Sequence, residues 1–361
     1  MEYQHGGDVY TNKGMLDFSA NINPLGPGSA VIEAAHDAVA RMTQYPDARC
    51  MELRRALAEA LRMKEAYFLF GNGGAELIFD VVRAKRPKKA VLLAPSFTEY
   101  RQALLAQGCR IVWYPLEESE DFELNEGYLE YLNEDVDMIF LCSPNNPVGN
   151  VIEPDLLRRV LRRCKEKGIC MVMDECFCEF LDSWEEHTLL TMITEYPNLF
   201  IIRAFTKMYA MPGLRLGYGV CSDARLIGRM EELRQPWSVS VIAQEAGVAA
   251  VKDTGHPART RAYIRQEREW IVEQLRAMGV RYYTPAANYV FLRSEHDLYG
   301  ELRKHGILIR DCSNYDGLCK GYYRFAVRRR QENLRLMEAL RQICTQPEIL
   351  ESNRERKGEM R

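Results

Sequence analysis

The sequence predicts an α/β protein, with a large domain built on a mostly parallel sheet and a smaller α+β domain. Two observations point to this class. Short apolar runs alternate with amphipathic helical patterns through the middle of the chain, whereas long amphipathic helices alternate with strands in its last third. The length of 361 residues also suits one large domain with an appendage.

Four apolar runs are the strand candidates of the large domain. They are apolar along most of their length, as expected of parallel strands that are covered on both faces. Between the second and third runs, a helix begins near Pro154, places leucines on one face and ends at Gly168. This β-α-β alternation predicts an open, right-handed, doubly wound sheet. The runs are residues 90–94, 136–142, 169–173 and 199–204.

The last third of the chain predicts the smaller domain. Long amphipathic helices at 259–278 and 333–343 alternate with strands at 289–293 and 322–327. We expect an N-terminal arm that packs with the small domain, and a polar C-terminal tail that is disordered. The expected divisions are 1–45 for the arm and part of the small domain, 46–245 for the large domain, 246–345 for the C-terminal small domain and 346–361 for the tail.

Composition and charge exclude several classes of protein. A formal net charge of −3 argues against a nucleic-acid partner. No apolar run approaches the ~18–20 residues that span a bilayer, and residues 1–10 lack the apolar core of a signal peptide. Eleven cysteines without CxxC spacing favour reduced thiols over disulfides. We therefore expect a cytoplasmic protein with no metal site and no membrane partner.

Functional side chains follow the predicted strands. Ligands of open α/β sheets bind beyond the carboxyl ends of the strands. Phe97 follows the first run, Asn146 the second, Asp174 the third and Lys207 the fourth. An aromatic face can stack on a planar ring, and an amide can donate to a ring oxygen. A carboxylate can hold a ring nitrogen protonated, and a lysine can form a Schiff base with an aldehyde.

A second group of residues suits a phosphate. Residues 71–76 are glycine-rich and begin a helix, so that Gly74 and Ala75 can offer backbone N–H groups to an anion. Thr206 and Arg215 can add a hydroxyl and a guanidinium group to the same phosphate. The two groups together point to pyridoxal 5′-phosphate, an electron sink for carbanions.

The segment 206–218 resembles the lysine motif of the fold-type I pyridoxal-phosphate aminotransferases, classes I and II. The motifs at 145–149 and 174–175 follow the order and spacing of that family, and the resemblance extends from about residue 17 to 343. It implies a fold-type I architecture in which the large domain binds pyridoxal phosphate. It also implies that Lys207 is the catalytic lysine and Asp174 the partner of the ring nitrogen.

The resemblance further implies shared active sites. Tyr45 matches a tyrosine that reaches the cofactor phosphate of the neighbouring subunit, so we expect a homodimer. Arg324 matches the arginine that binds the α-carboxylate of the substrate. Asn23 and Arg310 are weaker candidates for substrate contacts. His5, together with Gly6, is expected to fold over a substrate phosphate.

Within the family, two branches are similar to this chain: histidinol-phosphate aminotransferases and the L-threonine O-3-phosphate decarboxylases of cobalamin synthesis. Segments 5–8, 18–26, 95–100, 309–315 and 323–328 look more like the decarboxylases. Phe177 stands where aminotransferases often have a tyrosine, and it cannot donate a hydrogen bond to the ring oxygen. The resemblance therefore implies decarboxylation of a small phosphorylated amino acid, L-threonine O-3-phosphate, to (R)-1-aminopropan-2-yl phosphate.

Two alternatives stay open at this point. A histidinol-phosphate-type aminotransferase would use the same residues and would require 2-oxoglutarate or glutamate. A catalytically silent sensor or scaffold of this fold would have no reason to keep the lysine, aspartate, asparagine and arginine together. The sequence also leaves open whether the enzyme prefers threonine phosphate or serine phosphate. The two substrates differ by one methyl group, and a pocket for one methyl group discriminates between them by only ~1–3 kcal/mol.

Overall fold

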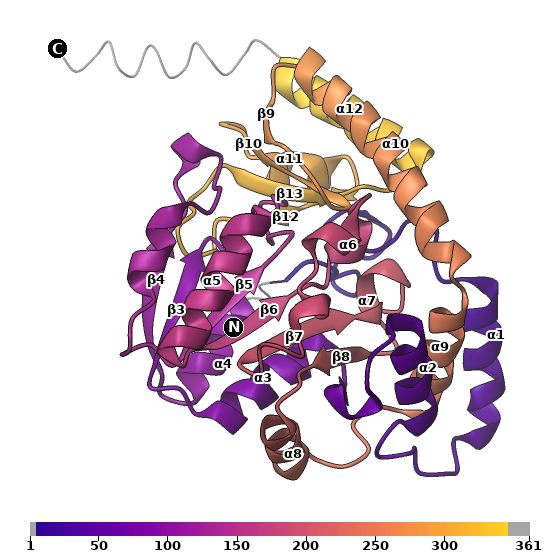
Figure 1. Cartoon of the computed structure of the whole chain (residues 1–361). Helices are drawn as coiled ribbons and strands as arrows, with labels where there is room; N and C mark the ends of the chain where they lie inside the picture. The colour runs from indigo at the N-terminus through magenta and orange to yellow at the C-terminus, as the bar shows by residue number, and fades with distance from the viewer. Residues whose placement is uncertain (1–4, 346–361) are drawn as a thin grey trace.

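The computed structural model describes residues 5–345, and a seven-stranded sheet forms its centre (Figure 1). The strand order is β2-β8-β7-β6-β5-β3-β4, and every strand except β8 runs parallel to the others. The strands are β2 (Phe68–Gly71), β3 (Lys89–Ala94), β4 (Arg110–Pro115), β5 (Met138–Cys142), β6 (Cys170–Asp174), β7 (Leu199–Ala204) and β8 (Gly217–Val220).

Side chains of the central strands alternate between two hydrophobic cores. In β5, Ile139 and Leu141 lie in one core, and Met138 and Phe140 lie in the other. Both faces are covered by helices, which explains the continuous apolar runs in the sequence. One face carries α2 (Met51–Leu61), α5 (Pro154–Lys167) and α9 (Val241–Lys252), and the other carries α3 (Gly74–Lys85), α4 (Thr98–Ala106) and α8 (Ala224–Leu233).

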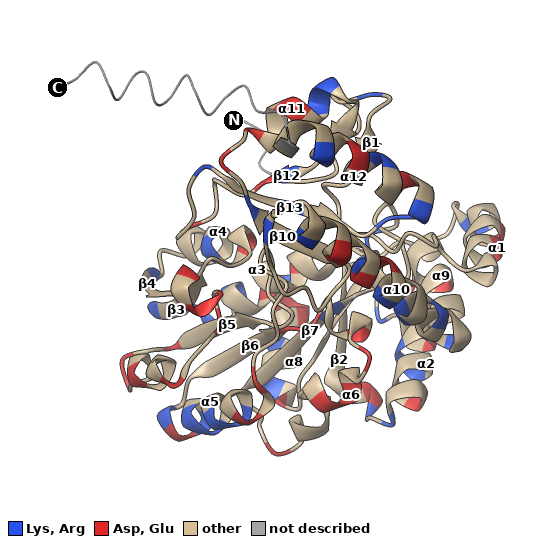
Figure 2. Ribbon diagram, turned by 90° about the horizontal axis from the view of Figure 1, so that it is seen from above, with Lys and Arg blue, Asp and Glu red and all other residues tan. Residues whose placement is uncertain are grey.

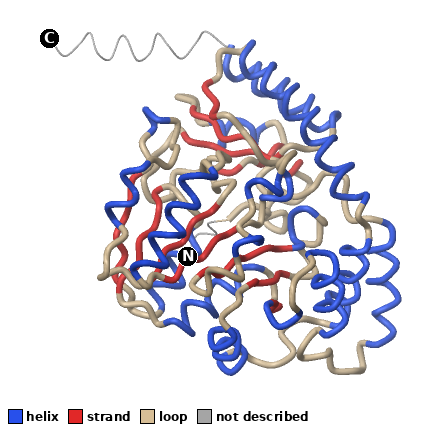
Figure 3. Tube along the Cα trace, in the orientation of Figure 1, coloured by secondary structure: helices blue, strands red, loops and turns tan. Residues whose placement is uncertain are grey.

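The C-terminal part has its own sheet and core. Its four antiparallel strands have the order β12-β13-β10-β9, and a long helix, α10, packs beside α12 (Figures 1 and 3). The strands are β9 (Arg281–Tyr283), β10 (Tyr289–Arg293), β12 (Arg310–Asp311) and β13 (Tyr322–Ala326). The helices are α10 (Gly255–Ala277), α11 (Leu298–Lys304) and α12 (Arg330–Thr345).

The N-terminal residues divide between the two parts. β1 (Leu16–Asp17) pairs in parallel with β11 (Ile307–Leu308), and Phe18 lies in the C-terminal core. In contrast, α1 (Ser29–Ala38) packs against α9, and its Val31 belongs to a core of the large sheet. The arm therefore crosses from one part of the molecule to the other.

The predicted α/β class is confirmed, and the four apolar runs form β3, β5, β6 and β7. The predicted helix 154–168 is α5, whose side-chain cap is Glu153 and whose C-terminal Gly168 has a φ of 70°. The strands β2, β4 and β8 were not predicted, because they are short, glycine-containing or polar at the sheet edge. The domain boundaries stay predictions, and the predicted disordered tail lies outside the described residues.

The remaining short helices connect the main elements. They are α6 (Trp184–His187), α7 (Phe205–Met208) and the 3₁₀ helices Val39–Arg41, Glu65–Tyr67, Glu118–Glu120, Glu126–Tyr131, Cys178–Phe180 and Leu190–Met192. The cysteines, all of which lie within residues 5–345, are free thiols. No helix in that range is both long and apolar enough to cross a bilayer. Acidic and basic residues alternate on outer helices such as α10 and α12 (Figure 2).

A buried ion pair joins β6 to β7 beside the ends of these strands. The guanidinium of Arg203 donates two hydrogen bonds, of 3.0 and 2.7 Å, to Glu175, and both side chains are essentially inaccessible to solvent. The other carboxylate oxygen of Glu175 accepts from the backbone N–H of Leu189 at 2.8 Å, and Thr188 donates to the pair at 2.7 Å. Because the polar atoms of Glu175 are satisfied, the pair is tolerated in the core.

Replacement of Glu175 by alanine should lower the free energy of unfolding by about 3–5 kcal/mol, because it leaves the Arg203 charge buried without a partner. The measurement is chemical unfolding followed by circular dichroism. Asp155→Ala, which breaks an exposed ion pair with Arg158 on α5, is the control and should change stability by less than about 1 kcal/mol. Equal effects of the two substitutions would contradict the assignment.

Candidate active site

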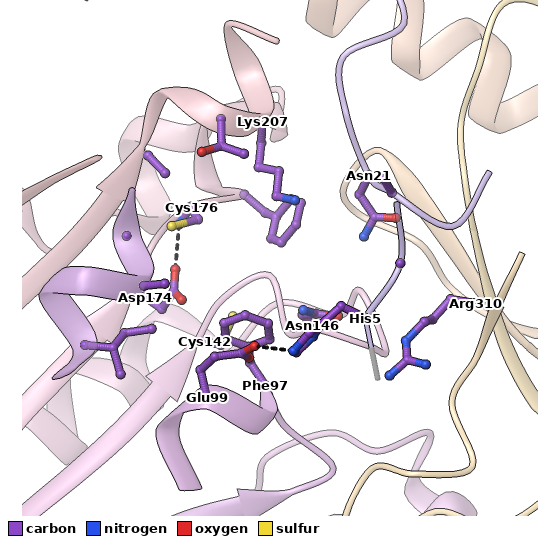
Figure 4. A pocket seen from close by; sticks show the side chains of 18 of the residues that line it. His5, Asn21, Phe97, Glu99, Cys142, Asn146, Asp174, Cys176, Lys207 and Arg310 are labelled. Atoms are coloured by element: carbon purple, nitrogen blue, oxygen red, sulfur yellow. Dashed lines mark hydrogen bonds and ion pairs between the residues drawn. The ribbon is translucent and has the colours of Figure 1, made fainter. Parts of the chain in front are cut away.

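A cavity of about 390 Å³ lies at the carboxyl ends of β3, β5, β6 and β7, facing β12 and β13 of the C-terminal sheet. Figure 4 shows Lys207 and Asp174 on one side, with Asn21 and Arg310 opposite. The lining residues are His5, Gly6, Ser19, Ala20, Asn21, Gly74, Ala75, Ile78, Phe97, Glu99, Cys142, Asn146, Asp174, Cys176, Phe177, Ala204, Thr206, Lys207, Arg215, Arg310, Tyr315 and Arg324.

Lys207 projects into this cavity from α7, directly after β7. Its Nζ lies 5.6 Å from the centre of the Phe177 ring. Burial, together with the nearby positive charge of Arg324, lowers the pKa of Lys207 from its usual 10.5 to about 8. The lysine amine is therefore partly neutral near pH 7 and able to act as a nucleophile.

Asp174 ends β6 with its carboxylate held by two donors. The Tyr100 hydroxyl donates to Oδ2 at 2.6 Å, and the Cys176 backbone N–H donates to Oδ1 at 2.9 Å. Burial raises the pKa of Tyr100 well above its usual value, so this hydroxyl remains a donor. Tyr100 is itself fixed by stacking on Phe140 and by an edge contact with Phe97.

The start of α3 forms a cradle for an anion together with Arg215. Gly73 has a φ of 82°, and a Cβ there would lie 2.5 Å from Arg215 Nη2. A Cβ on Gly217 would lie 2.5 Å from the backbone nitrogen of Gly74, so the β8 strand approaches as closely as glycine permits. Gly74, Ala75 and Thr206 line the same end of the cavity.

Arg324 lies on β13 at the opposite wall. It is 5% exposed, and its guanidinium donates to Asn146 Oδ1 and, at 2.9 Å, to the carbonyl oxygen of Ser19. Its Nε has no hydrogen-bond partner among residues 5–345. Asn21 Oδ1, also buried, has no partner in the same range. These unpaired polar atoms at the cavity wall indicate that a polar ligand belongs there.

Arg310 and His5 line the cavity mouth. The Arg310 guanidinium donates to Asn314 at 2.8 Å and lies over the Tyr315 ring. His5 pairs with Glu99, at 3.1 Å from Nε2 to Oε1, and Gly6 packs against Ser19. The structure thus brings together the predicted residues His5, Gly6, Gly74, Ala75, Phe97, Asn146, Asp174, Thr206, Lys207, Arg215, Arg310 and Arg324.

Two predicted site residues do not line the cavity. The amide of Asn23 is buried and donates instead to the carbonyl oxygen of Met208 and to Thr260, each at 2.8 Å. The amide donors of Asn23 are therefore occupied within the protein, and its expected substrate contact stays a prediction. Tyr45 is 79% exposed and stacks on Trp237 with ring centres 4.6 Å apart. Its predicted contact with a second subunit stays a prediction.

Several cavity residues were not predicted. Asn21 lies two residues before Asn23 in the same motif and is the asparagine that reaches the cavity. Tyr100 does not line the cavity but donates to Asp174. It follows Phe97 by three residues at the start of α4, a spacing that places it near the same strand end. Glu99 and Tyr315 carried no signal beyond their positions in segments 95–100 and 309–315.

The cavity fits pyridoxal phosphate. The glycine cradle with Thr206 and Arg215 suits the phosphate, and the doubly held Asp174 suits a protonated ring nitrogen. The only lysine in the cavity lining, among the described residues, has a lowered pKa that suits an aldehyde partner. The fit rests on donors, charge and glycine contacts that the structure shows directly.

The model of the family "Aminotransferase class I and II" matches residues 13–340, so the chain belongs to that family. It is an enzyme of this pyridoxal-phosphate-dependent group. Among curated relatives, threonine-phosphate decarboxylase of Salmonella typhimurium is 39% identical over 92% of both chains. Histidinol-phosphate aminotransferase of Symbiobacterium thermophilum is 32% identical over 92% of both chains.

Solved structures give the same picture of the fold. The histidinol-phosphate aminotransferase of Clostridium acetobutylicum superposes with a TM-score of 0.86 at 30% identity, covering 91% of this chain and 99% of the other. The L-threonine-O-3-phosphate decarboxylase of Porphyromonas gingivalis superposes with a TM-score of 0.81 at 23% identity, with the same coverage. The chain is similar to members of both branches.

The lowered pKa of Lys207 predicts how apoprotein takes up pyridoxal phosphate. The neutral amine is the reactive form, so the uptake rate should rise with pH and level off above about 8. At pH 7 about a tenth of such amines are neutral, against fewer than one in a thousand at a pKa of 10.5. Absorbance of the bound cofactor gives the rate. Arg324→Gln removes one of the positive charges that lower the pKa of Lys207, so it should shift the midpoint of the pH profile upward. A rate that rises without inflection beyond pH 9.5 would contradict the prediction.

Proposed function

We propose that this enzyme decarboxylates L-threonine O-3-phosphate to (R)-1-aminopropan-2-yl phosphate, with pyridoxal phosphate as cofactor, in cobalamin biosynthesis. The observation that carries the proposal is the pair Arg324 and Arg310 in one cavity with Lys207. Arg215 and the α3 cradle suffice for the cofactor phosphate. Two further arginines therefore suit a substrate with two anionic groups, a carboxylate and a phosphate.

The identity to relatives supports the same substrate. The Salmonella typhimurium relative, 39% identical over nearly the whole chain, has the name threonine-phosphate decarboxylase. The cavity places His5, Gly6 and Asn21 near Arg310, so that the substrate phosphate would meet a cation and polar groups there. Arg324, fixed by Asn146 and Ser19, would meet the carboxylate.

The chain's own residues divide the work of this reaction. When bound, pyridoxal phosphate supplies an electron sink for the electrons that remain on Cα after carbon dioxide leaves. Arg324 binds the carboxylate and orients the bond to be broken. Lys207 holds the proton that returns to Cα, and the Phe177 ring beside Nζ keeps that region apolar. Asp174, held by Tyr100, keeps negative charge at the ring-nitrogen position.

An aminotransferase reaction is the second candidate. Relatives named histidinol-phosphate aminotransferase reach 32% identity in sequence, and the neighbour with a TM-score of 0.86 has the same name. That reaction would use the same cofactor site, with Lys207 moving a proton from Cα, and would require 2-oxoglutarate. Phe177 favours the decarboxylase, because it provides no hydroxyl beside Lys207.

We also propose that the enzyme works as a homodimer in the cytoplasm. Tyr45 and Trp237 form an exposed aromatic pair, which supports a surface that a second copy covers. Free thiols at all eleven cysteines support a reducing compartment.

Purified enzyme with pyridoxal phosphate should release carbon dioxide steadily from L-threonine O-3-phosphate when no keto acid is present, because decarboxylation returns the cofactor to its starting form. Release is measured by coupled assay or with ¹⁴C-labelled substrate. Lys207→Ala is the control and should abolish release. Absence of release from wild type, with turnover of histidinol phosphate plus 2-oxoglutarate, would establish the aminotransferase instead.

Arg310→Gln should raise the KM for L-threonine O-3-phosphate by about 10- to 100-fold with a small change in kcat, because a charged hydrogen bond to the phosphate contributes about 1.5–3 kcal/mol. Steady-state kinetics of carbon dioxide release provides both constants. Arg162→Gln, on the exposed side of α5, is the matched control and should leave them unchanged. An unchanged KM in the Arg310 variant would remove this residue from the substrate site.

A further inference from the structure

Residues 5–7 form a strap that lies across the active-site cavity. At one end the backbone N–H of Gly7 donates to the Ser19 hydroxyl at 2.7 Å. Gly6 passes so close to the same residue that a Cβ on it would lie 2.2 Å from the Ser19 carbonyl oxygen. Since that carbonyl also accepts from Arg324, this end of the strap is tied to the C-terminal wall of the site.

The other end of the strap is tied to the opposite wall. His5 Nε2 lies 3.1 Å from Glu99 Oε1, and Figure 4 shows this link between the two side chains in the cavity wall. Glu99 belongs to the first turn of α4, and its side chain is 12% exposed. The Thr98 hydroxyl donates to the second carboxylate oxygen at 3.2 Å, so that Glu99 is held in place for His5.

The strap also separates two cavities. An outer cavity of about 530 Å³ shares His5, Gly6, Ser19 and Arg310 with the active-site cavity. Its other walls come from residues 8–12, from α11 and from residues 308–314. Both cavities therefore meet at the strap, and a ligand that moves from the outer cavity to the active site must pass His5 and Arg310.

Glu99 is an unexpected residue for this position. A carboxylate on the wall of a cavity built for anions repels them unless a cation neutralises it. Burial raises the pKa of Glu99, whereas the charges of His5 and Arg310 lower it. Glu99 is therefore compensated by these neighbours, and the one that belongs to the strap is His5.

We propose that Glu99 is a positioning residue, whose ion pair with His5 holds the strap closed between the outer cavity and the bound phosphorylated substrate. This inference rests on the proposed function for the nature of the substrate. Glu99 acts through His5: it touches neither the α-carboxylate site at Arg324 nor Lys207. Closure keeps the backbone of Gly6 and the Arg310 guanidinium around the substrate phosphate.

Glu99→Gln, tested in the holoenzyme, keeps the side-chain shape and removes the charge. The KM for L-threonine O-3-phosphate should rise about ten-fold with kcat changed less than about two-fold, because binding loses the closed strap and the chemistry is untouched. In a His5→Ala background the same substitution should have no further effect on kcat/KM, since its partner is already absent. Glu166→Gln, an exposed glutamate on α5, is the matched control and should behave as wild type.

Hydrogen exchange of the substrate-free holoenzyme gives a readout that does not depend on turnover. A peptide that contains Gly6 and Gly7 should exchange faster in Glu99→Gln than in wild type, because the Gly7 hydrogen bond to Ser19 opens more often. Unchanged exchange would overturn the proposal. Three kinetic results would also overturn it. The first is a lower KM, which would mean that Glu99 repels the substrate. The others are a lower kcat at constant KM and independent effects of the His5 and Glu99 substitutions.

The two proposals fail in different ways. If wild-type enzyme releases no carbon dioxide from L-threonine O-3-phosphate, the proposed function is wrong, and the exchange comparison still decides whether Glu99 positions the strap. If wild-type enzyme is active and the effects of the His5 and Glu99 substitutions on kcat/KM are independent, the proposed function stands and the proposed role of Glu99 is wrong.

Discussion

The buried pair between Glu175 and Arg203 is the interaction on which the geometry of the site depends. It joins β6 to β7 one residue beyond Asp174 and four residues before Lys207. A charge pair in the core is favourable only when its hydrogen bonds are in place, so it constrains β6 and β7 to one arrangement. The backbone N–H of Glu175 also donates to Ile202, which fixes the same register. Asp174 and Lys207 are thereby held in a fixed relation to each other.

The electrostatic balance of the cavity follows from this arrangement. The cavity lining holds more basic than acidic residues. The basic residues are Lys207, Arg215, Arg310, Arg324 and His5, and the acidic residues are Asp174 and Glu99. Without anionic ligands, this excess of positive charge disfavours a further cation, and together with burial it lowers the pKa of Lys207. The same excess favours anionic ligands, such as the phosphate of pyridoxal phosphate. One charge distribution therefore both activates the nucleophile and selects anionic ligands.

The sequence predicted the residues that follow strands better than those in irregular segments. Asn146, Asp174 and Lys207 follow β5, β6 and β7, and parallel strands bring their carboxyl ends to one edge, so their proximity could be predicted from order alone. Residues 19–24 have no regular structure, and no periodicity indicates which asparagine faces the ligand. Asn21 lines the cavity, and Asn23 fixes the Met208 carbonyl. The role of Tyr45 depends on a second chain, which a single sequence does not describe.

The choice between reactions depends on how rigidly the carboxylate site is held. Arg324 is anchored by Asn146 from the large sheet and by Ser19 from the N-terminal segment, so its guanidinium plane is set by both parts of the molecule. If Arg324 binds the substrate carboxylate as proposed, a guanidinium fixed in this way would orient the bond from Cα to that carboxylate. Ser19 also receives the Gly7 end of the strap. Under the proposed function, closure of the strap over the substrate phosphate and orientation of the carboxylate would therefore be linked through Ser19, which accepts hydrogen bonds from both Gly7 and Arg324.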